Sequence, residues 1–192
     1  MSERAVRPMN LAEFLRWEDG TDTRYELVSG FPMAVAPPAR AHGILCARLA
    51  GLIDVRLRPR RPCTAQTEAG ISRPDRDDSF FVADIAVTCR PYERGEQLVK
   101  EPILIVEILS PGTERHDRLT KVPVYRGIAN VEEILLIDSE SLYAEVLRHE
   151  AGRWVTTLVR GPEALLRLAS VDVAVVMSEL YDGIDIDAGA EP

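Results

Sequence analysis

Long apolar runs are missing from this sequence, which argues against a membrane-spanning helix. The chain has 192 residues, of which 46% are hydrophobic and 28% charged, as in ordinary globular domains. Its apolar runs are far shorter than the roughly 20 residues that a helix needs to cross a bilayer. The N-terminal segment lacks an apolar signal core and carries acidic residues early, so we expect no export signal and a cytoplasmic location.

Cysteine is scarce in this chain. Cys46, Cys63 and Cys89 are far apart and odd in number. This pattern predicts neither a disulfide framework nor a zinc knuckle, because both need several regularly spaced cysteines. A reducing compartment is the simplest environment for such thiols, in agreement with the cytoplasmic expectation.

Several catalytic signatures are also absent. No Gly-x-Gly-x-x-Gly phosphate loop occurs, and the segment 110–113 is too short to be one. Ser110 and Ser139 lack a Gly-x-Ser-x-Gly setting, and no cysteine has the histidine context of a thiol enzyme. Without internal repeats, we expect a single domain over residues 1–192, with a core at about 11–180 and an acidic tail at 181–192 that frays.

Positive charge is in deficit, since the formal net charge is −8. A chain of this sign is not expected to coat nucleic acid by bulk electrostatics. The segment 40–61 differs, because it contains several arginines but only one acidic residue, Asp54. We expect a local basic surface there, with nucleic-acid contacts at Arg40, Arg48, Arg56 and Arg58.

The order of the predicted elements indicates a mixed α/β fold, a central mixed β-sheet flanked by helices. Helical spacing occurs at 10–19, 37–59 and 112–128, with Pro123 expected at a bend or a new turn. Strand patterns occur at 24–36 (two strands), 63–72, 80–89, 102–110, 132–140, 143–152 and 153–161, and 168–183 predicts one more strand and a short helix.

Two acidic residues lie in the middle of apolar strands. Asp84 occurs in "FFVADIAVT" and Glu107 in "ILIVEILS". If the two strands are neighbours, both carboxylates can enter one small volume, where one must be protonated or a cation must bind. Mg²⁺ is satisfied by one or two carboxylates together with waters and phosphate oxygens. The alternative for each acid is a buried ion pair with an arginine, or an exposed strand end.

The helix predicted after the Glu107 strand carries a polar stripe. Asp117, Lys121 and Tyr125 are spaced i, i+4, i+8 and share one face. The stripe can lean back over the two acids, where a lysine could orient a water or stabilise charge on a phosphoryl group. A surface Asp–Lys pair is the alternative interpretation.

Two residues elsewhere are further candidates. Glu26 lies in the strand pattern "RYELV", on the face opposite Tyr25, and is either a site residue or an exposed glutamate. His42 begins the arginine-bearing helix, where it either caps the helix or faces the site as a proton carrier or phosphate contact. His116 and His149 show no partner that suggests metal binding, so we assign them no role.

The order "YELVSG", "PPARAH", "VADIAV", "IVEILSPGT", "DRLTK…Y" resembles a large bacterial family of restriction endonuclease-like proteins. This family, formerly a domain of unknown function, belongs to the PD-(D/E)XK nuclease superfamily. The resemblance extends over about 11–180 and implies a restriction-endonuclease-like fold. It implies metal binding by Asp84, Glu107 and the Ile108 carbonyl, a catalytic role for Lys121, and an additional acid at Glu26 that can help to bind the metal.

The sequence departs from the superfamily pattern at two positions. Ala83 precedes Asp84 in place of proline, which shapes the backbone and supplies no ligand. Leu109 stands two residues after Glu107, where the motif has its lysine. Lys121 fits a lysine displaced to the following helix.

The resulting expectation is a Mg²⁺- or Mn²⁺-dependent endonuclease that hydrolyses DNA with a metal-activated water, functions as a homodimer and has no membrane partner. A non-catalytic protein of the same fold that binds nucleic acid or a protein partner is the alternative. Hydrolysis of another phosphate substrate at the same site is a third reading.

Overall fold

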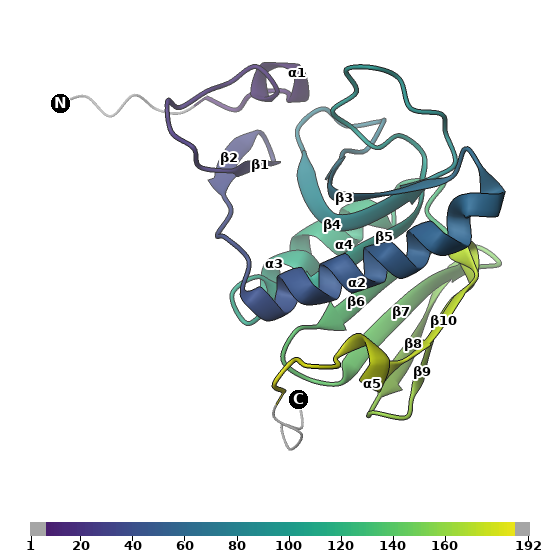
Figure 1. Ribbon diagram of the computed structural model, residues 1–192. Coiled ribbons are helices and arrows are strands. Elements are labelled where there is room, and N and C mark those ends of the chain that lie inside the picture. Colours follow the sequence, from purple (N-terminus) through teal and green to yellow (C-terminus); the bar gives the residue numbers. More distant parts are fainter. Residues whose placement is uncertain (1–6, 187–192) are drawn as a thin grey trace.

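The computed structural model describes residues 7–186 and is organised around one six-stranded sheet (Figure 1). The strand order is β3-β4-β5-β6-β7-β8, and only β5 and β6 pair in parallel. The strands are β3 (Thr64–Ile71), β4 (Phe81–Thr88), β5 (Pro102–Leu109), β6 (Glu133–Asp138), β7 (Tyr143–Glu150) and β8 (Arg153–Arg160). The mixed sheet with flanking helices confirms the predicted fold class.

Helical segments cover both faces of the sheet (Figure 1). The long helix α2 (Arg40–Leu57) crosses one face. A continuous segment made of α3 (Glu114–His116), η2 (Asp117–Lys121) and α4 (Val122–Tyr125) covers the other and connects β5 to β6. Between residues 7 and 186, no helix is both long and apolar enough to cross a bilayer.

Smaller elements complete the described chain. Near the N-terminus lie α1 (Leu11–Phe14), which begins with a capping box at Asn10, and a hairpin of β1 (Tyr25–Val28) and β2 (Phe31–Ala34). The short turn η1 (Arg58–Arg60) follows α2. After β8 come β9 (Leu165–Leu168), η3 (Ala169–Val171), β10 (Val173–Val176) and α5 (Met177–Leu180). The β9–β10 sheet was not predicted, because β9 is short and follows a polar turn.

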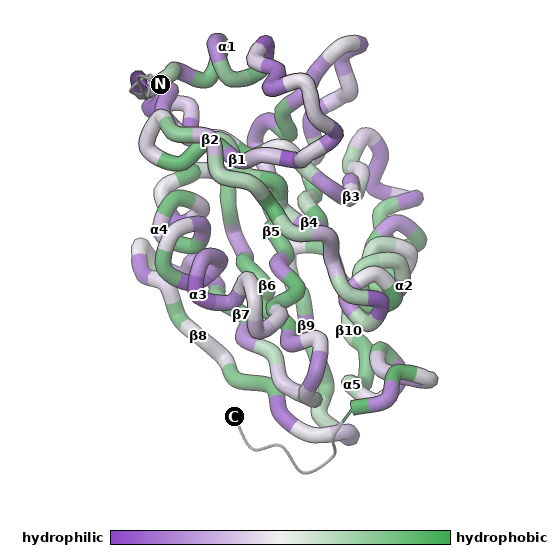
Figure 2. The backbone as a smooth tube through the Cα atoms, turned by 90° about the vertical axis from the view of Figure 1, so that its left-hand side faces the viewer, coloured by the Kyte–Doolittle hydropathy of each residue, from purple (hydrophilic) through white to green (hydrophobic). Residues whose placement is uncertain are grey.

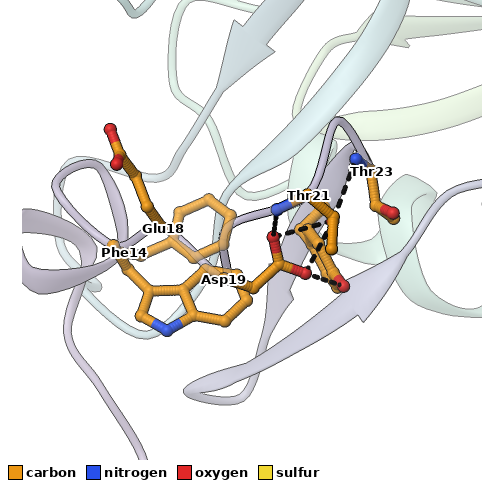
Figure 3. A pocket seen from close by; sticks show the side chains of 7 residues that line it. Phe14, Glu18, Asp19, Thr21 and Thr23 are labelled. Atoms are coloured by element: carbon orange, nitrogen blue, oxygen red, sulfur yellow. Dashed lines mark hydrogen bonds between the residues drawn. The ribbon is translucent and has the colours of Figure 1, made fainter.

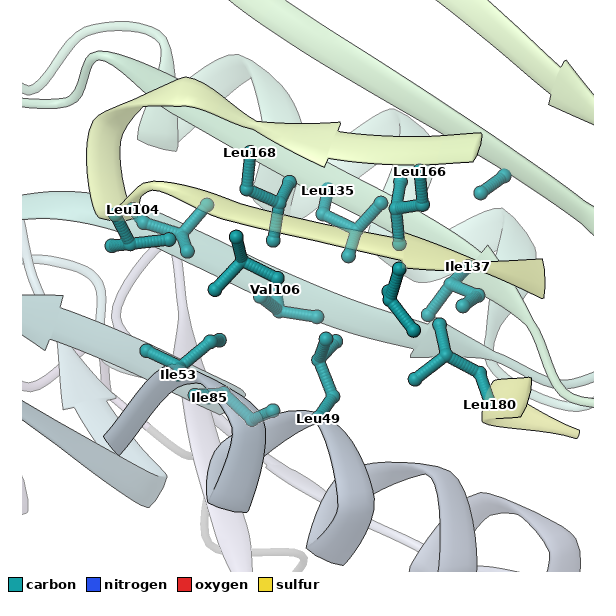
Figure 4. Close-up of a cluster of buried hydrophobic side chains, with 14 of the residues drawn as sticks. Leu49, Ile53, Ile85, Leu104, Val106, Leu135, Ile137, Leu166, Leu168 and Leu180 are labelled. Carbon is teal, nitrogen blue, oxygen red and sulfur yellow. The ribbon is translucent and has the colours of Figure 1, made fainter. Parts of the chain in front are cut away.

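The core explains why the central strands are apolar throughout. In Figure 4, Leu49 and Ile53 of α2 point toward Ile85 and Val106 of the sheet. A second cluster packs the opposite face against α4, so strands such as β5 are buried on both sides. Figure 2 shows the resulting hydrophobic colouring along the central strands.

Strands β4 and β5 separate at the point where each carries its acid. Their pairing runs from Thr88–Pro102 only as far as Ile85–Val106. Beyond that pair, β4 continues alongside β3, and β5 continues alongside β6. The sheet therefore forms a fork at Asp84 and Glu107, which frees backbone groups of β5 on the side facing β4.

The cysteines form a disulfide, which the sequence did not predict. Cys63 and Cys89 are bonded, while Cys46 is free. The pair directly flanks the Thr64–Thr88 register of β3 and β4, so the antiparallel ladder brings the two thiols together across 26 residues of sequence. The expectation that the cysteines form no disulfide was wrong. Cysteines far apart in the sequence can lie next to each other when their strands pair.

The C-terminal segment is ordered further than expected. Tyr181 is buried, and its hydroxyl donates to the carbonyl of Asp138. Ile184 and Ile186 pack against the core cluster that contains α2. Residues 181–186 of the predicted tail thus pack on the core, and the rest of that tail, 187–192, lies outside the described residues.

Adjacent positions of α2 test the packing. Ile53 is fully buried, whereas the neighbouring Leu52 is 40% exposed. We expect Ile53→Ala to lower the free energy of unfolding by about 2–5 kcal/mol, because it removes buried methyl groups and leaves a cavity. Leu52→Ala serves as the control and should change it by less than about 1 kcal/mol. Equal losses in urea unfolding would contradict the assignment of the buried face.

Candidate functional site

The fork in the sheet brings Asp84 and Glu107 into one polar region. Glu107 is buried, and the side chain of Asp84 is partly exposed. Asp84 Oδ2 accepts a hydrogen bond of 2.7 Å from the backbone N–H of Ile108, and so replaces a ladder bond lost at the fork. Because the N–H and C=O of a strand residue point to the same side, the Ile108 carbonyl also faces this region.

Lys121 is at the centre of the cluster. Its Nζ lies 3.1 Å from Glu26 Oε1 and 3.3 Å from Glu107 Oε2. The same atom lies 3.1 Å from Asp117 Oδ1 and donates to the Val82 carbonyl at 3.2 Å. One buried ammonium therefore joins three carboxylates from β1, β5 and η2 to the backbone of β4.

The predicted polar stripe of the helix is present and faces inward. Asp117 and Lys121 lie in a π-helical turn, and Tyr125 follows one turn later. The Tyr125 hydroxyl donates a 2.6 Å hydrogen bond to Glu107 Oε1. Pro123 falls where the wide turn gives way to α4, as expected for a residue that cannot donate a helical hydrogen bond.

Glu26 belongs to the cluster, and His116 joins it unexpectedly. Glu26 is buried, and its Oε1 accepts from the Val82 N–H at 3.0 Å. Its Oε2 lies 2.8 Å from His116 Nε2. The sequence analysis assigned His116 no role, and the structure places its ring against one oxygen of Glu26. In the sequence, only the position of His116 directly before Asp117 pointed to the site. Its partner Glu26 is 90 residues away, so the local pattern could not identify the contact.

Burial and Lys121 together set the ionisation of the cluster. Burial raises the pKa of Glu107 well above its usual range, and Lys121 only partly opposes this effect. Burial likewise raises the pKa of Asp117 against the attraction of Lys121. For Glu26, burial is outweighed by His116 and Lys121, which hold its pKa below the usual range.

The lysine itself remains charged. Burial disfavours the ammonium, but the three surrounding carboxylates outweigh this and raise the pKa of Lys121 above its usual range. Burial also raises the pKa of Tyr125 well above 10, so its hydroxyl stays a hydrogen-bond donor to Glu107. Lys121 can therefore donate hydrogen bonds and neutralise charge, but it is not poised to accept a proton.

His42 approaches the fork from the other face of the sheet. Its Nε2 lies 3.1 Å from Asp84 Oδ1, while its buried Nδ1 has no hydrogen-bond partner among residues 7–186. His42 thus belongs to the site through Asp84, and does not cap α2, whose N-terminus shows no side-chain cap.

The predicted arginine surface is not a single patch at the site. Arg40 is exposed at the start of α2, whereas Arg56 lies in the last turn of this 18-residue helix and Arg58 begins η1 just beyond it. Arg48 instead donates to the Leu180 carbonyl, which ties α2 to α5. These positions do not bring the four arginines together beside the acidic cluster.

A separate hollow of about 260 Å³ lies by the N-terminal segment (Figure 3). Its lining residues include Phe14, Trp17, Asp19 and Tyr25. Tyr25 and Glu26 are consecutive strand residues and point to opposite faces of the hairpin, so this hollow does not open onto the cluster. Both Asp19 oxygens already accept hydrogen bonds, from the Thr21 hydroxyl and from the Tyr25 hydroxyl.

The two lysines of the chain provide a matched test of the cluster. Removing the ammonium with Lys121→Met leaves buried carboxylates uncompensated, so we expect a loss of about 3–5 kcal/mol in unfolding free energy near pH 8 without divalent cations. Lys100→Met is the control, since Lys100 is 44% exposed and paired at the surface. It should cost less than about 1 kcal/mol.

The loss in Lys121→Met should depend on pH. Without Lys121, the folded-state pKa values of Glu107 and Asp117 rise further above their unfolded values. Groups with raised folded-state pKa values favour folding at low pH, and this stability is lost as the pH rises through the folded-state values. Urea unfolding should therefore show a smaller deficit at pH 5 than at pH 8, and equal deficits would contradict the charge assignment.

Comparisons with known proteins agree with this fold. The model of the Uma2 family, described as "Putative restriction endonuclease", matches residues 11–177. Two similar proteins of Synechocystis sp. are uncharacterized: slr1290 is 25% identical over 90% of each chain, and sll1609 is 23% identical over 86% of this chain and 95% of its own. The crystal structure of "a putative nuclease belonging to DUF820" from Anabaena variabilis matches with a TM-score of 0.74 at 21% identity, over 91% of this chain and 98% of that one.

Proposed function

Because this chain belongs to the Uma2 family, we propose that it is a metal-dependent nuclease that hydrolyses phosphodiester bonds in DNA. The observation that carries the proposal is the fork between β4 and β5, which carries Asp84 and Glu107, with the Lys121 ammonium 3.3 Å from Glu107. Family and fold suggest a nuclease, and this cluster supplies the groups that metal-assisted phosphodiester hydrolysis requires.

The donor set fits a hard divalent cation. The carboxylates of Glu26, Glu107 and Asp117 surround one ammonium, so the cluster carries excess negative charge when all three are ionised. Within residues 7–186, no three His, Cys, Asp or Glu side chains lie close enough together to hold a metal by themselves. Mg²⁺ commonly binds to one or two carboxylates and keeps several waters. Asp84, Glu107 and the Ile108 carbonyl would hold Mg²⁺ or Mn²⁺ in this way, with waters and phosphate oxygens completing the shell.

The bound cation would supply a water of lowered pKa and positive charge at the phosphate. The residues of the chain have separate tasks. Lys121 donates hydrogen bonds to the water or to a phosphoryl oxygen, which neutralises developing charge. Tyr125 orients Glu107, and the Ile108 N–H orients Asp84. Glu26 positions Lys121 and is itself positioned by His116.

Lys121 takes the place of the motif lysine. Leu109, two residues after Glu107, is apolar and is buried in the core cluster that includes Tyr125. The motif position therefore brings no charged side chain to the site. The ammonium comes instead from the π-helical turn, 3.3 Å from Glu107. This geometry favours an active nuclease over an inactive one despite the missing motif lysine.

One observation favours the alternative, a nuclease-fold protein that only binds nucleic acid or a partner. Both oxygens of Glu107 already have donors, Tyr125 and Lys121. The two oxygens of Asp84 face Ile108 and His42. Such a network is largely satisfied without a cation, so metal binding would have to displace some of these contacts.

Plasmid cleavage tests the proposal directly. We expect pure protein to nick or linearise plasmid with Mg²⁺ or Mn²⁺, and Asp84→Asn and Glu107→Gln to lower the rate at least about 100-fold. Asp54→Asn is the control, because this acid lies on the exposed side of α2 and pairs with Arg58. Calorimetric titration with Mn²⁺ distinguishes the nuclease from the non-catalytic alternative. The nuclease should lose its metal site in Asp84→Asn, whereas a protein that only binds nucleic acid or a partner need not. No cleavage by the wild type with either metal would refute the nuclease.

A further inference from the structure

An exposed arginine lies next to the strand that carries Glu26. Arg24 directly precedes β1, and its carbonyl accepts a hydrogen bond from the Val35 N–H, which extends the β1–β2 ladder by one pair. Alternate residues of a strand point to the same face, so Arg24 shares the face on which Glu26 reaches Lys121. The side chain of Arg24 is 65% exposed, whereas that of Glu26 is buried. This face therefore has its acid inside the cluster and its arginine at the solvent side.

Strand β1 lies beside the part of β4 that leads to Asp84 (Figure 1). Leu27 and Phe80 form an antiparallel bridge and exchange two backbone hydrogen bonds. In an antiparallel arrangement, a step back along one strand matches a step forward along the other. The direction from Leu27 back to Arg24 is therefore the direction from Phe80 forward to Asp84, and Arg24 lies on the Asp84 side of the bridge.

Glu68 connects Arg24 to the position of Asp84. The Arg24 guanidinium forms an ion pair with the Glu68 carboxylate. In the β3–β4 ladder, Glu68 is opposite Asp84, between regular pairs on either side, and its φ of 50° interrupts the ladder at this point. Both acids also act on one thiol, since burial, then Asp84 and Glu68, raise the pKa of Cys46 to about 11. Arg24 is therefore held at the residue that faces Asp84 across the sheet.

The solvent-exposed edge of the fork at Asp84 needs positive charge if a phosphate is to enter there. The side chain of Asp84 is 22% exposed, whereas Glu107 is buried. Lys121 is also buried, and three carboxylates offset its charge. The net charge of −8 gives the chain no general attraction to DNA. A phosphate that arrives from solvent therefore depends on a local cation, and the contacts of Glu68 place Arg24 at this edge.

We propose that Arg24 is a substrate-binding residue that contacts a DNA backbone phosphate, and that Glu68 competes with this phosphate for it. In the free protein, Glu68 holds the guanidinium in place. When DNA binds, a phosphate beside the scissile one replaces the Glu68 carboxylate. A guanidinium forms paired, charge-assisted hydrogen bonds with phosphates and carboxylates alike, so one can replace the other. This inference rests on the proposed function, because it concerns substrate binding at the same site.

Neutralising each partner of the ion pair separately tests the proposal. Binding of a fluorescein-labelled DNA duplex is measured by fluorescence anisotropy, with Ca²⁺ in place of Mg²⁺ and at several salt concentrations. Arg24→Gln should weaken binding about 5-fold and make the slope of log K against log salt shallower by about one, because one phosphate contact is lost. Glu68→Gln should tighten binding about 3-fold, because it frees the guanidinium for phosphate. A purely structural ion pair predicts effects of the same sign, since both substitutions break it.

Arg58 and Asp54 provide a matched control pair. Arg58 is 67% exposed and lies 3.8 Å from Asp54, beyond the end of α2 that is opposite to His42. Arg58→Gln and Asp54→Asn change the net charge as the two test variants do. Each should change the affinity less than about 2-fold, because exposed charges separated by more than a Debye length are largely screened. Arg24→Lys keeps the charge and should retain most of the binding, and urea unfolding confirms that each variant is folded.

Three results overturn the inference: a wild type that binds no DNA, effects of the same sign in Arg24→Gln and Glu68→Gln, or a loss in Arg24→Gln no larger than that in Arg58→Gln. Failure of the inference and failure of the proposed function remain distinguishable. A wild type that cuts plasmid while Arg24→Gln binds DNA normally contradicts the phosphate contact and leaves the nuclease in place. Effects of opposite sign in a protein that cuts no DNA support the phosphate contact and contradict the nuclease.

Discussion

The described structure depends on one buried cation. The Lys121 ammonium offsets carboxylates from three separate elements, and without it the fork between β4 and β5 would hold only negative charge. The cost of burying these acids is high, and a hydrophobic replacement would be simpler for stability alone. A cluster that burial makes costly for stability is the kind of arrangement from which the proposed metal site starts.

The surrounding fold explains how such a site is kept rigid. Both faces of the sheet are packed, so β5 holds Glu107 between two hydrophobic clusters. Helix α2 reaches Asp84 from one face through His42, and the π-helical turn reaches Glu107 from the other through Lys121. Reactive groups held by strands and helices keep their positions better than groups held by loops.

Much of this arrangement could be predicted from the sequence, because it follows local periodicity. Acids within apolar strands, Asp84 and Glu107, and the four-residue spacing from Asp117 to Lys121 were visible without a structure. His116 was missed because its partner Glu26 is 90 residues away. The disulfide was missed for the same reason, since cross-strand pairing is a tertiary property. The divalent metal ion remains a prediction, because the charge of the residues suits such an ion without testing whether it binds.

A crystal structure of the protein soaked with Mn²⁺, with anomalous data collected at the manganese edge, tests the central claim most directly. We expect one anomalous peak at the fork, with Mn²⁺ bound by carboxylate oxygens of both Asp84 and Glu107 and with Lys121 still charged beside Glu107. Manganese bound at neither acid, while the cluster keeps its present hydrogen bonds, would contradict it.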